Sequence, residues 1–455
     1  MPINSFLYPG AKVTTAYDVD NSVRFNRGDS PYFARAQGTA TGATKYTLSM
    51  WIKRAFLGTE MNLIGVSSGN TIELIKFNAD NKLYWYNRDA SSNAAENGTS
   101  NVFRDTSAWY NLVFVYDSTQ SGAANQRKLY LNGVNQTWGS ANAVQSNAVP
   151  GLNLSGATIN IGAESTPSLY YGGYMCEVNF IDGLALTASS FGEFDSDSPT
   201  IWKPKNASGL TFGNNGFYLD FKDSSNLGND AAGGTDFSEN NIVAADQATD
   251  TCTNNFCTVN PLDQYGTYTL SEGNCQITSG HTSWYTIGST MAVQNGKWYW
   301  EVEFDAGTMI EIFVGVHDTS VNRTDTNAWL TGSSLFYNDA GGEIRKDGTN
   351  STEDYGTLSA GDILGIALNM DDKQITLYKN GSAIASNVAL SSSISEAMPT
   401  FLTDANDVVF KVNFGGCPSF VISSGNADGN GYGNFEYSVP SNYYSLCTKN
   451  LAEFG

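Results

Sequence analysis

Three acidic residues at alternate positions of one strand-like run are the first candidates for chemistry in this sequence. Glu301, Glu303 and Asp305 belong to the run WYWEVEFD at 298–305, and alternation places their carboxylates on one face. Glycosidases use two carboxylates, one as acid and one as nucleophile or base. Glycosidases with these acids on one strand have the pattern E-x-D-x-(x)-E, whereas the order here is E-V-E-F-D. We therefore expect a solvated strand face and no enzymatic activity.

Other catalytic or metal sites have little support in the sequence. His281 lies in a polar turn and His317 follows a strand-like run, and no Gly-x-Ser-x-Gly or phosphate-binding Gly-rich Lys motif is present. A structural zinc site at Cys252 and Cys257 would need two more ligands close by. We expect free thiols, no metal and no cofactor. The cysteines are Cys176, Cys252, Cys257, Cys275, Cys417 and Cys447.

Aromatic residues in two predicted loops are the candidates for ligand binding. Sugar rings stack on exposed aromatic faces, while Asn and Asp bind sugar hydroxyls, so such clusters suit glycan capture. Core packing is the competing interpretation for each single residue. The run YWY at 84–86 leaves open whether its outer pair or its tryptophan is buried. The predicted ligand-binding residues are Trp329, Phe336, Tyr337, Asp339, Tyr170, Tyr171 and Tyr174.

The composition favours strands and excludes two classes of partner. Charged residues are 15% of the 455 residues, aromatic residues are 13%, and there are 46 glycines. That mixture is typical of strands joined by many turns. The net charge of −21 repels phosphate backbones, so we expect no nucleic acid partner. We also expect no membrane insertion and no export signal, since no apolar run is long enough and the first residues lack a basic start.

One hairpin pattern occurs twice and indicates two related sandwiches in tandem. The sequences LYLNG at 129–133 and LYKNG at 377–381 each follow a β-rich run. Asn-Gly favours a type I′ turn, because both central residues take positive φ. Short strand-like runs separated by polar turns recur in both halves, which is typical of sandwiches and jelly rolls. We therefore predict an all-β fold of two tandem antiparallel β-sandwiches.

Strand-like runs and composition divide the chain into five segments. The predicted strands are 46–52, 61–66, 71–77, 83–86, 110–116, 128–131, 157–161, 175–181, 298–304, 310–316, 363–368, 375–378 and 408–414, and 91–98 is a predicted polar turn. Residues 223–251 are rich in Asp, Asn, Ser, Gly and Ala, which indicates a linker. The predicted segments are an N-terminal arm (1–20), a first sandwich (21–222), a linker (223–262), a second sandwich (263–416) and a C-terminal tail (417–455).

Two sets of short phrases carry a resemblance to known families. The first set is YTLSMWIK from Tyr46, WYNLVFVYD from Trp109, LYLNG from Leu129 and YMCEVNFIDGLAL from Tyr174. These phrases resemble the laminin G-like jelly roll of the concanavalin type. The second set is GKWYWEVE from Gly296, GDILGIALNMD from Gly361, ITLYKNG from Ile375 and VNFG from Val412, and it resembles a SPRY domain. Because SPRY modules share the concanavalin-like sandwich, the resemblance implies two concanavalin-like jelly rolls and accounts for the repeated hairpin.

Further phrases resemble structural proteins of tailed bacteriophages. They are SFLYPG at 5–10, LGND at 227–230, DTCTNNFCTVNPL at 250–262 and KNLAEFG at 449–455. The resemblance implies a virion surface protein, assembled in the host cytoplasm, that acts as a tail fibre or adhesin and binds host-surface glycans. It implies other virion proteins as partners and a homo-oligomer. Two alternatives stay open, namely a capsid decoration protein without a specific ligand and a polysaccharide-degrading enzyme.

The first 20 residues form a predicted attachment arm. Their isolated apolar residues are interrupted by proline and glycine, so we expect them to order only against another virion protein. Phe6, Leu7 and Tyr8 are the predicted anchors, because aromatic and aliphatic side chains dominate interface energy. A frayed chain end is the competing interpretation.

Overall fold

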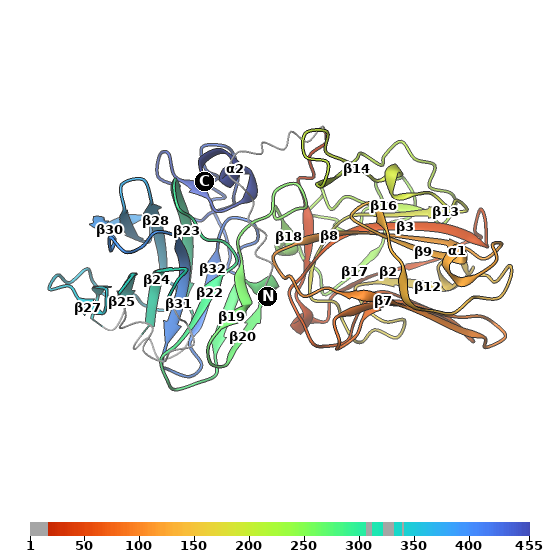
Figure 1. The fold of residues 1–455 in the computed structure, drawn as a ribbon, viewed down its shortest axis with the longest axis horizontal. Helices are drawn as coiled ribbons and strands as arrows, with labels where there is room; N and C mark the ends of the chain where they lie inside the picture. The colour runs from red at the N-terminus through yellow and green to blue at the C-terminus, as the bar shows by residue number, and fades with distance from the viewer. Residues whose placement is uncertain (1–16, 306–311, 322–331, 339–340) are drawn as a thin grey trace. The chain divides into compact units, whose positions relative to one another are not determined.

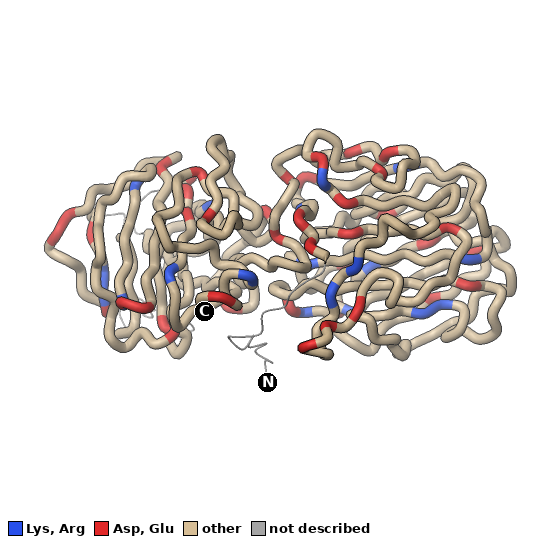
Figure 2. Tube along the Cα trace, turned by 90° about the horizontal axis from the view of Figure 1, so that it is seen from above, with Lys and Arg blue, Asp and Glu red and all other residues tan. Residues whose placement is uncertain are grey.

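The computed structural model describes residues 17–305, 312–321, 332–338 and 341–455. The described residues up to Thr253 form one compact unit, and Asn254 to Gly455 form the other. Both units consist largely of strands (Figure 1). Acidic residues occur along the trace of each unit (Figure 2), in keeping with the net charge of −21. In these described ranges, no helix has the length and apolar character needed to cross a membrane.

Two large antiparallel sheets form the first unit. One has the order β10-β9-β8-β3-β13-β1-β18, with β16 also paired to β13, and the other has the order β11-β7-β6-β5-β4-β12-β2-β17. The bounds are β1 (Ser22–Phe25), β2 (Tyr32–Ala36), β3 (Lys45–Arg54), β4 (Met61–Ser68), β5 (Thr71–Phe77), β6 (Lys82–Arg88), β7 (Ala94–Val102), β8 (Trp109–Asp117), β9 (Arg127–Leu131), β10 (Val134–Asn135), β11 (Trp138–Ala141), β12 (Thr158–Ile161), β13 (Gly173–Asp182), β16 (Phe217–Leu219), β17 (Ser238–Asn240) and β18 (Gln247–Ala248). The short helix α1 (Ala123–Gln126) precedes β9, and β14 (Gly192–Phe194) pairs with β15 (Trp202–Pro204).

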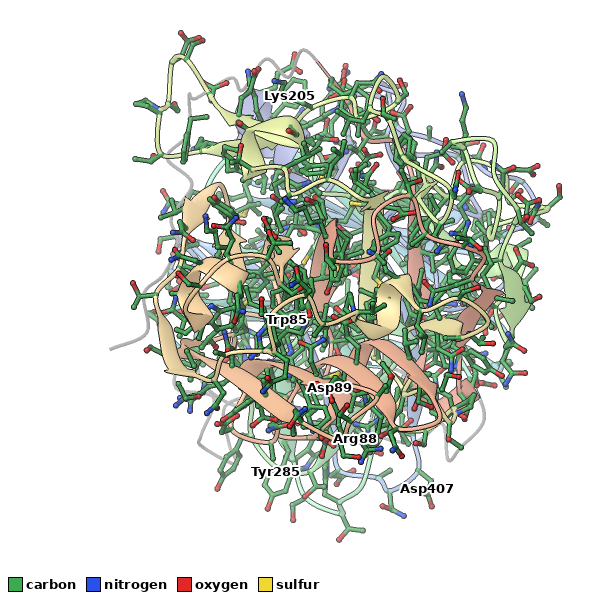
Figure 3. The ribbon with its side chains drawn as sticks, turned by 90° about the vertical axis from the view of Figure 1, so that its right-hand side faces the viewer. Trp85, Arg88, Asp89, Lys205, Tyr285 and Asp407 are labelled. Carbon is green, nitrogen blue, oxygen red and sulfur yellow. The ribbon has the colours of Figure 1, made fainter. Side chains whose placement is uncertain are left out.

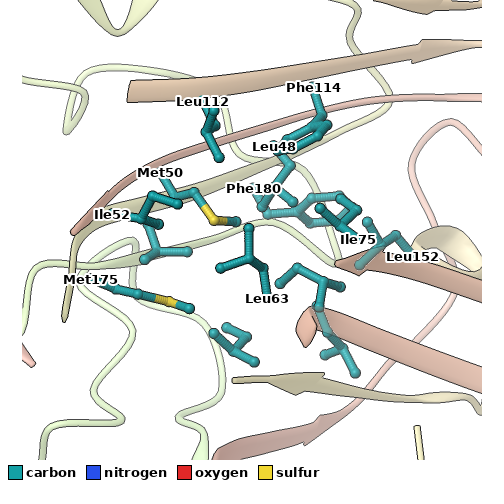
Figure 4. Close-up of a cluster of buried hydrophobic side chains, with 14 of the residues drawn as sticks. Leu48, Met50, Ile52, Leu63, Ile75, Leu112, Phe114, Leu152, Met175 and Phe180 are labelled. Carbon is teal, nitrogen blue, oxygen red and sulfur yellow. The ribbon is translucent and has the colours of Figure 1, made fainter. Parts of the chain in front are cut away.

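The apolar core of the first unit is shared by its two large sheets. Leu48, Met50 and Ile52 alternate along β3 and have no exposed surface. They belong to one cluster with Leu63 and Ile75 of the opposite sheet (Figure 4). Burying one such side chain stabilises the fold by about 1.5–3 kcal/mol. The alternation of apolar residues therefore fixes which face of each strand turns inward.

The other face of the β3-containing sheet is covered as well. Val113 of β8 and Ile181 of β13 pack in a separate cluster with Phe191, which follows β13 in the chain. Trp202 lies against Gly133, where an added Cβ would come within 2.2 Å of its ring. The segment after β13 thus forms a third layer over this sheet.

The predicted linker over 223–262 is wrong, because its residues belong to the two units. Within it, β17 pairs with β2 and β18 pairs with β1. Asp230 pairs with Arg35 at 3.0 Å and Asp250 with Lys53 at 2.7 Å, and none of these four side chains is more than 7% exposed. Composition suggested solvated residues, but buried charges are tolerated when they are paired. The first unit therefore extends to Thr253 instead of ending at residue 222.

Two further sheets form the second unit. Their orders are β19-β22-β31-β24-β25-β26-β27 and β20-β21-β32-β23-β28-β29-β30, with β33 also paired to β23. The bounds are β19 (Val259–Gln264), β20 (Tyr268–Ser271), β21 (Gln276–Ser279), β22 (Tyr285–Ser289), β23 (Lys297–Phe304), β24 (Ile312–Asp318), β25 (Ser334–Asn338), β26 (Glu343–Lys346), β27 (Thr349–Asn350), β28 (Ile363–Asn369), β29 (Gln374–Lys379), β30 (Ser382–Ala389), β31 (Ala397–Thr403), β32 (Val409–Asn413) and β33 (Tyr444–Ser445). Trp298, Trp300 and Val302 of β23 are fully buried in the core, as their alternation predicts.

The predicted C-terminal tail over 417–455 is also wrong, because it is part of the second unit. Strand β33 pairs in parallel with β23, and helix α2 (Thr448–Phe454) follows it. Phe435 packs on Tyr299 with ring centroids 5.2 Å apart, and both are buried. Cys447 forms an isolated bridge with Phe256, so the end of the predicted linker belongs to this unit too. The segment covers the face of β23 that the sequence suggested was solvated.

Both predicted Asn-Gly hairpins are confirmed, and they have the same geometry. In Asn132-Gly133 and in Asn380-Gly381, the asparagine φ is 48° and the glycine φ is 78°. These positive values are those of a type I′ turn. The asparagine side chain accepts the backbone N–H of Asn111 at 2.8 Å in the first unit and of Ile363 at 2.9 Å in the second. The predicted all-β fold of tandem sandwiches is confirmed.

Candidate ligand-binding site

The acidic face of β23 lies under the C-terminal segment instead of facing solvent. Glu301 has no exposed surface. Its carboxylate accepts the backbone N–H groups of Glu436 at 2.9 Å and Tyr437 at 2.8 Å, and also the Tyr299 hydroxyl at 3.1 Å. Burial raises the pKa of Glu301, while the hydrogen bonds oppose that rise. The prediction of a solvated position is wrong for Glu301, whose carboxylate holds the C-terminal segment on the sheet.

The two remaining acids of this face are bound by one lysine. Lys411 Nζ lies 3.1 Å from Glu303 Oε1 and 2.9 Å from Asp305 Oδ2. Burial of Glu301 leaves Glu303 and Asp305 as the partly exposed acids of this face, and both are paired with the Lys411 ammonium group.

Four of the seven predicted ligand-binding residues are core residues. Phe336 and Tyr337 on β25, Tyr174 on β13 and Tyr171 just before β13 are at most 1% exposed. Strand β25 is buried on both faces, since Phe336 packs in one apolar cluster and Tyr337 in another. The prediction that these four form an exposed stacking surface is therefore wrong.

The other predicted site residues lie at the surface or outside the described ranges. Tyr170 is half-buried, and its hydroxyl donates to the Pro167 carbonyl at 3.0 Å. It therefore lies apart from the buried tyrosines that follow it. The residues outside the described ranges are Trp329, Asp339, Phe6, Leu7 and Tyr8.

Both histidines pack against aromatic rings. His281 lies edge-on to Tyr268 at 4.6 Å and near Tyr285 at 4.7 Å between ring centroids, and burial lowers its pKa. His317 lies within β24, 4.6 Å from the ring of Phe336. These surroundings indicate packing roles. No group of three or more His, Cys, Asp or Glu side chains in the described part of the chain could hold a metal ion.

A shallow recess that is widely open to solvent lies in the second unit beside the β26–β27 hairpin and β30. Its volume is about 450 Å³, within the range of small-molecule sites. The lining combines apolar side chains, one aromatic ring and several polar groups. The lining residues are Ile344, Lys346, Asp347, Thr349, Asn350, Ser351, Tyr355 and Val388.

Hydrogen bonds hold the hairpin wall of the recess in one shape. The Ser351 N–H donates to the Ile344 carbonyl at 2.7 Å, and its Oγ accepts the Ile344 N–H at 3.1 Å. Arg345 donates to the Asn350 side-chain oxygen at 3.0 Å. A wall that is already ordered loses little freedom when a ligand binds.

Tyr355 supplies the aromatic surface of the recess. Its backbone N–H donates to the Gly342 carbonyl at 2.6 Å, and its hydroxyl donates to Glu353. The bond to Glu353 raises the pKa of Tyr355 to about 12, so the hydroxyl remains protonated at neutral pH. The half-buried ring is thus anchored at its backbone and at its hydroxyl. Aromatic rings of this kind offer a stacking surface to the apolar face of a sugar.

A second aromatic surface lies on β6 of the first unit. Trp85 has no exposed surface, so Tyr84 and Tyr86 take the outward positions, which resolves the open question about this run. Figure 3 shows Trp85 within the unit and Arg88 nearer its edge. The Tyr84 ring lies over Gly98, where an added Cβ would come within 2.8 Å. A strand face encloses less of a ligand than a recess does, which makes this surface the weaker candidate.

Sequence reasoning missed two buried acids in the first unit. Glu73 of β5 accepts the Trp85 indole N–H at 3.0 Å and the Leu152 backbone N–H at 2.9 Å. Glu177 of β13 accepts the Tyr218 hydroxyl at 2.8 Å. Both lie in strongly apolar strand-like runs, TIELIKF and YMCEVNF, and this apolar context could have indicated that the two acids are buried. Each carboxylate is enclosed by protein groups, so neither is offered to a ligand.

Comparisons with family models agree with this division of the chain. Residues 27–190 match a laminin G-type model described as the concanavalin A-like lectin/glucanases superfamily. Residues 297–416 match the model of the SPRY domain. The chain carries a concanavalin A-like domain and a SPRY domain. Each compact unit continues beyond its matched region, to Thr253 in the concanavalin A-like unit and to Gly455 in the SPRY unit.

Solved structures show likeness at low sequence identity. The SPRY domain of human HERC1 is 18% identical, with a TM-score of 0.31, over 36% of this chain and 99% of that one. The heptameric SAP-like pentraxin from Limulus polyphemus is 16% identical, with a TM-score of 0.29, over 38% of this chain and 80% of that one. The TRIM65 PSpry domain is 16% identical, with a TM-score of 0.28, over 34% and 91% of the two chains. No protein with a curated description matches this chain.

Proposed function

We propose that this chain is a non-catalytic protein of the adhesin type that binds a glycan in the recess beside β26, β27 and β30. The recess is the observation that carries the proposal, because it brings an anchored aromatic ring and polar groups together in one open depression. A concanavalin A-like domain joined to a SPRY domain supports a binding role as well. The function of a domain still depends on its site.

The lining chemistry suits one face of a sugar ring and its hydroxyls. Tyr355 and Val388 offer apolar contact, while Lys346 and Thr349 carry groups that donate hydrogen bonds to hydroxyl oxygens. Asp347 in the same lining accepts from hydroxyls. The net charge of −21 repels polyanions, so the proposed ligand is a neutral glycan.

We also propose that this protein lies on the surface of a tailed bacteriophage particle. Its support is the resemblance of the phrases at 5–10, 227–230, 250–262 and 449–455. In that setting the glycan is on the host surface and the arm over 1–20 attaches to another virion protein. Deleting residues 1–20 should leave both units folded and abolish incorporation into particles. Normal incorporation would show that the arm does not attach the protein to the particle.

Binding measurements on variants test the site. Tyr355→Ala should weaken binding to a neutral host-surface polysaccharide roughly tenfold, because it removes the stacking surface. Tyr86→Ala removes a half-buried tyrosine of the other unit and serves as the matched control, with affinity unchanged. Loss of binding in Tyr86→Ala together with normal binding in Tyr355→Ala would move the site to β6 and overturn the assignment to the recess.

A further inference from the structure

Two cysteines of the first unit come together where the chain leaves it. Along β13, Met175 points into the core cluster, so Tyr174 and Cys176 point to the opposite face of the sheet. Cys176 is fully buried, whereas Cys252 is half-buried. Burial and the nearby Cys176 thiol raise the pKa of the Cys252 thiol, so the two side chains lie close together.

The path of the last residues of the unit accounts for this contact. Asp250 binds Lys53 at 2.7 Å, and Lys53 is the cross-strand neighbour of Tyr174 in the pairing of β3 with β13. Cys252 follows Asp250 by two residues, just as Cys176 follows Tyr174. Asp250 therefore lies over the outer face of this sheet, toward which Cys176 points, and Cys252 is two residues further along the chain.

Neighbouring hydrogen bonds fix this segment against the start of the described chain. The Thr251 hydroxyl donates to the Val19 carbonyl at 2.7 Å, and the Val19 N–H donates to Thr253 Oγ1 at 3.0 Å. The Ser22 hydroxyl donates to the Asp250 carbonyl at 2.6 Å. Bonds on both sides of Cys252 thus hold its backbone in place near Cys176.

We propose that Cys176 and Cys252 form a redox-sensitive pair that closes to a disulfide and clamps the exit of the chain from the first unit. The proposal is independent of glycan binding. A small-molecule disulfide, RSSR, is the oxidant. The Cys252 thiol loses its proton, and the resulting thiolate attacks one sulfur of RSSR to form the mixed disulfide Cys252–SR. The released RS⁻ takes up that proton and leaves as RSH. The Cys176 thiolate then attacks the Cys252 sulfur, forms the Cys176–Cys252 bond and releases the second RSH. Two protein thiols are oxidised and one disulfide is reduced.

The clamp would act on the part of the unit between the two cysteines. The closed loop contains β16, β17 and β18, whose pairings with β13, β2 and β1 complete the sheets. Cross-linking a long loop restricts the unfolded chain and raises the melting temperature. Burial raises the pKa of Cys252, so closure should speed up as the pH rises.

Thiol counting on the folded, full-length protein tests the proposal. The protein is incubated with oxidised glutathione without denaturant, then unfolded, alkylated and digested. We expect two of its six cysteines to become protected, with a peptide that links residues 176 and 252. The first melting transition should rise by roughly 5–10 °C and return on reduction. Cys252→Ser should abolish both effects, whereas Cys257→Ser, a buried cysteine of the other unit, should keep them.

Three results would overturn the proposal. One is alkylation of all six cysteines after native oxidation. A second is a stable glutathione adduct on Cys252 without the cross-link, which would show that Cys176 does not reach it. A third is a cross-link that survives in Cys252→Ser, which would assign the oxidation to other cysteines.

Discussion

Lys53 Nζ lies 2.7 Å from Asp250 Oδ2, and each of the two side chains is 1% exposed. The pair joins the middle of the first sheet to the last residues of the same unit. The indole N–H of Trp109 also donates to Asp250, at 3.1 Å. A segment whose composition resembles a linker thus supplies the carboxylate that neutralises a buried ammonium group on β3.

Fragment boundaries follow from this pair. A fragment that ends at Thr253 should show β-type circular dichroism and one cooperative melt, because it keeps Asp250, β17 and β18. A fragment that ends at residue 222 leaves Lys53 buried without its partner and should not melt cooperatively. Equal cooperative melts of the two fragments would contradict the extended unit.

Substitution of Asp250 tests the same interaction more locally. Asp250→Ala removes the carboxylate that pairs with the buried Lys53 ammonium group, so it should lower the free energy of unfolding by about 3–5 kcal/mol. Urea denaturation of the fragment that ends at Thr253 measures this change. Asp20→Ala removes an exposed acid of the same unit and should change stability by less than about 0.5 kcal/mol. Similar small effects of the two substitutions would argue against a structural role for Asp250.

Some parts of this fold could be predicted from the sequence because local rules determine them. The Asn-Gly turns require positive φ, and alternation along β23 decides which residues enter the core. Glu301 and Asp250 could not be assigned in this way, because their burial depends on partners more than 100 residues away. The polar residues at 91–98 predict a turn, but 94–98 belong to strand β7. The side chain of Asn97 is buried there, where it accepts a hydrogen bond from Arg127, and the sequence gives no sign of that partner.

The candidate site could be predicted even less. Phe336 and Tyr337 are aromatic residues in a predicted loop, which is why the sequence indicates ligand binding there. Composition alone cannot distinguish such a loop from a strand that is buried on both faces. The recess at Tyr355 arises from residues of β26, β27 and β30, which only the folded chain brings together. Tyr355 itself carried no signal beyond its residue type.

Substitution of Glu301 tests the correction at β23. Glu301→Gln replaces an acceptor oxygen with an amide donor that faces backbone N–H groups of Glu436 and Tyr437. We expect the free energy of unfolding of the full-length protein to fall by about 1–3 kcal/mol at pH 7. Glu303→Gln, at the partly exposed position beside Lys411, is the control and should cost less than about 1 kcal/mol. Equal stability of Glu301→Gln and the wild type would restore the solvated interpretation.

Glu177 predicts a pH dependence of the first unit. Burial raises its pKa to about 7 from the ordinary value of 4.5. Since the folded state holds this proton more tightly than the unfolded state, stability contributed by the neutral acid is present below pH 4.5 and is lost as the pH rises toward 7. The loss is on the order of 3 kcal/mol.

Glu177→Gln should remove this slope. The variant and the wild type, compared as fragments that end at Thr253, should approach each other in stability at low pH and diverge between pH 4.5 and 7, with the wild type falling more steeply. Thermal melts at a series of pH values measure the difference. Parallel curves across that interval would show that Glu177 titrates normally.

We expect the recess at Tyr355 to bind a glycan without cleaving it. The most direct measurement applies full-length wild type and Tyr355→Ala to an array of neutral surface polysaccharides and analyses the bound material for new reducing ends. We expect that the wild type retains a narrow set of glycans, that Tyr355→Ala loses them and that no new reducing ends form. Equal retention by both proteins, or reducing ends that appear with the wild type, would contradict it.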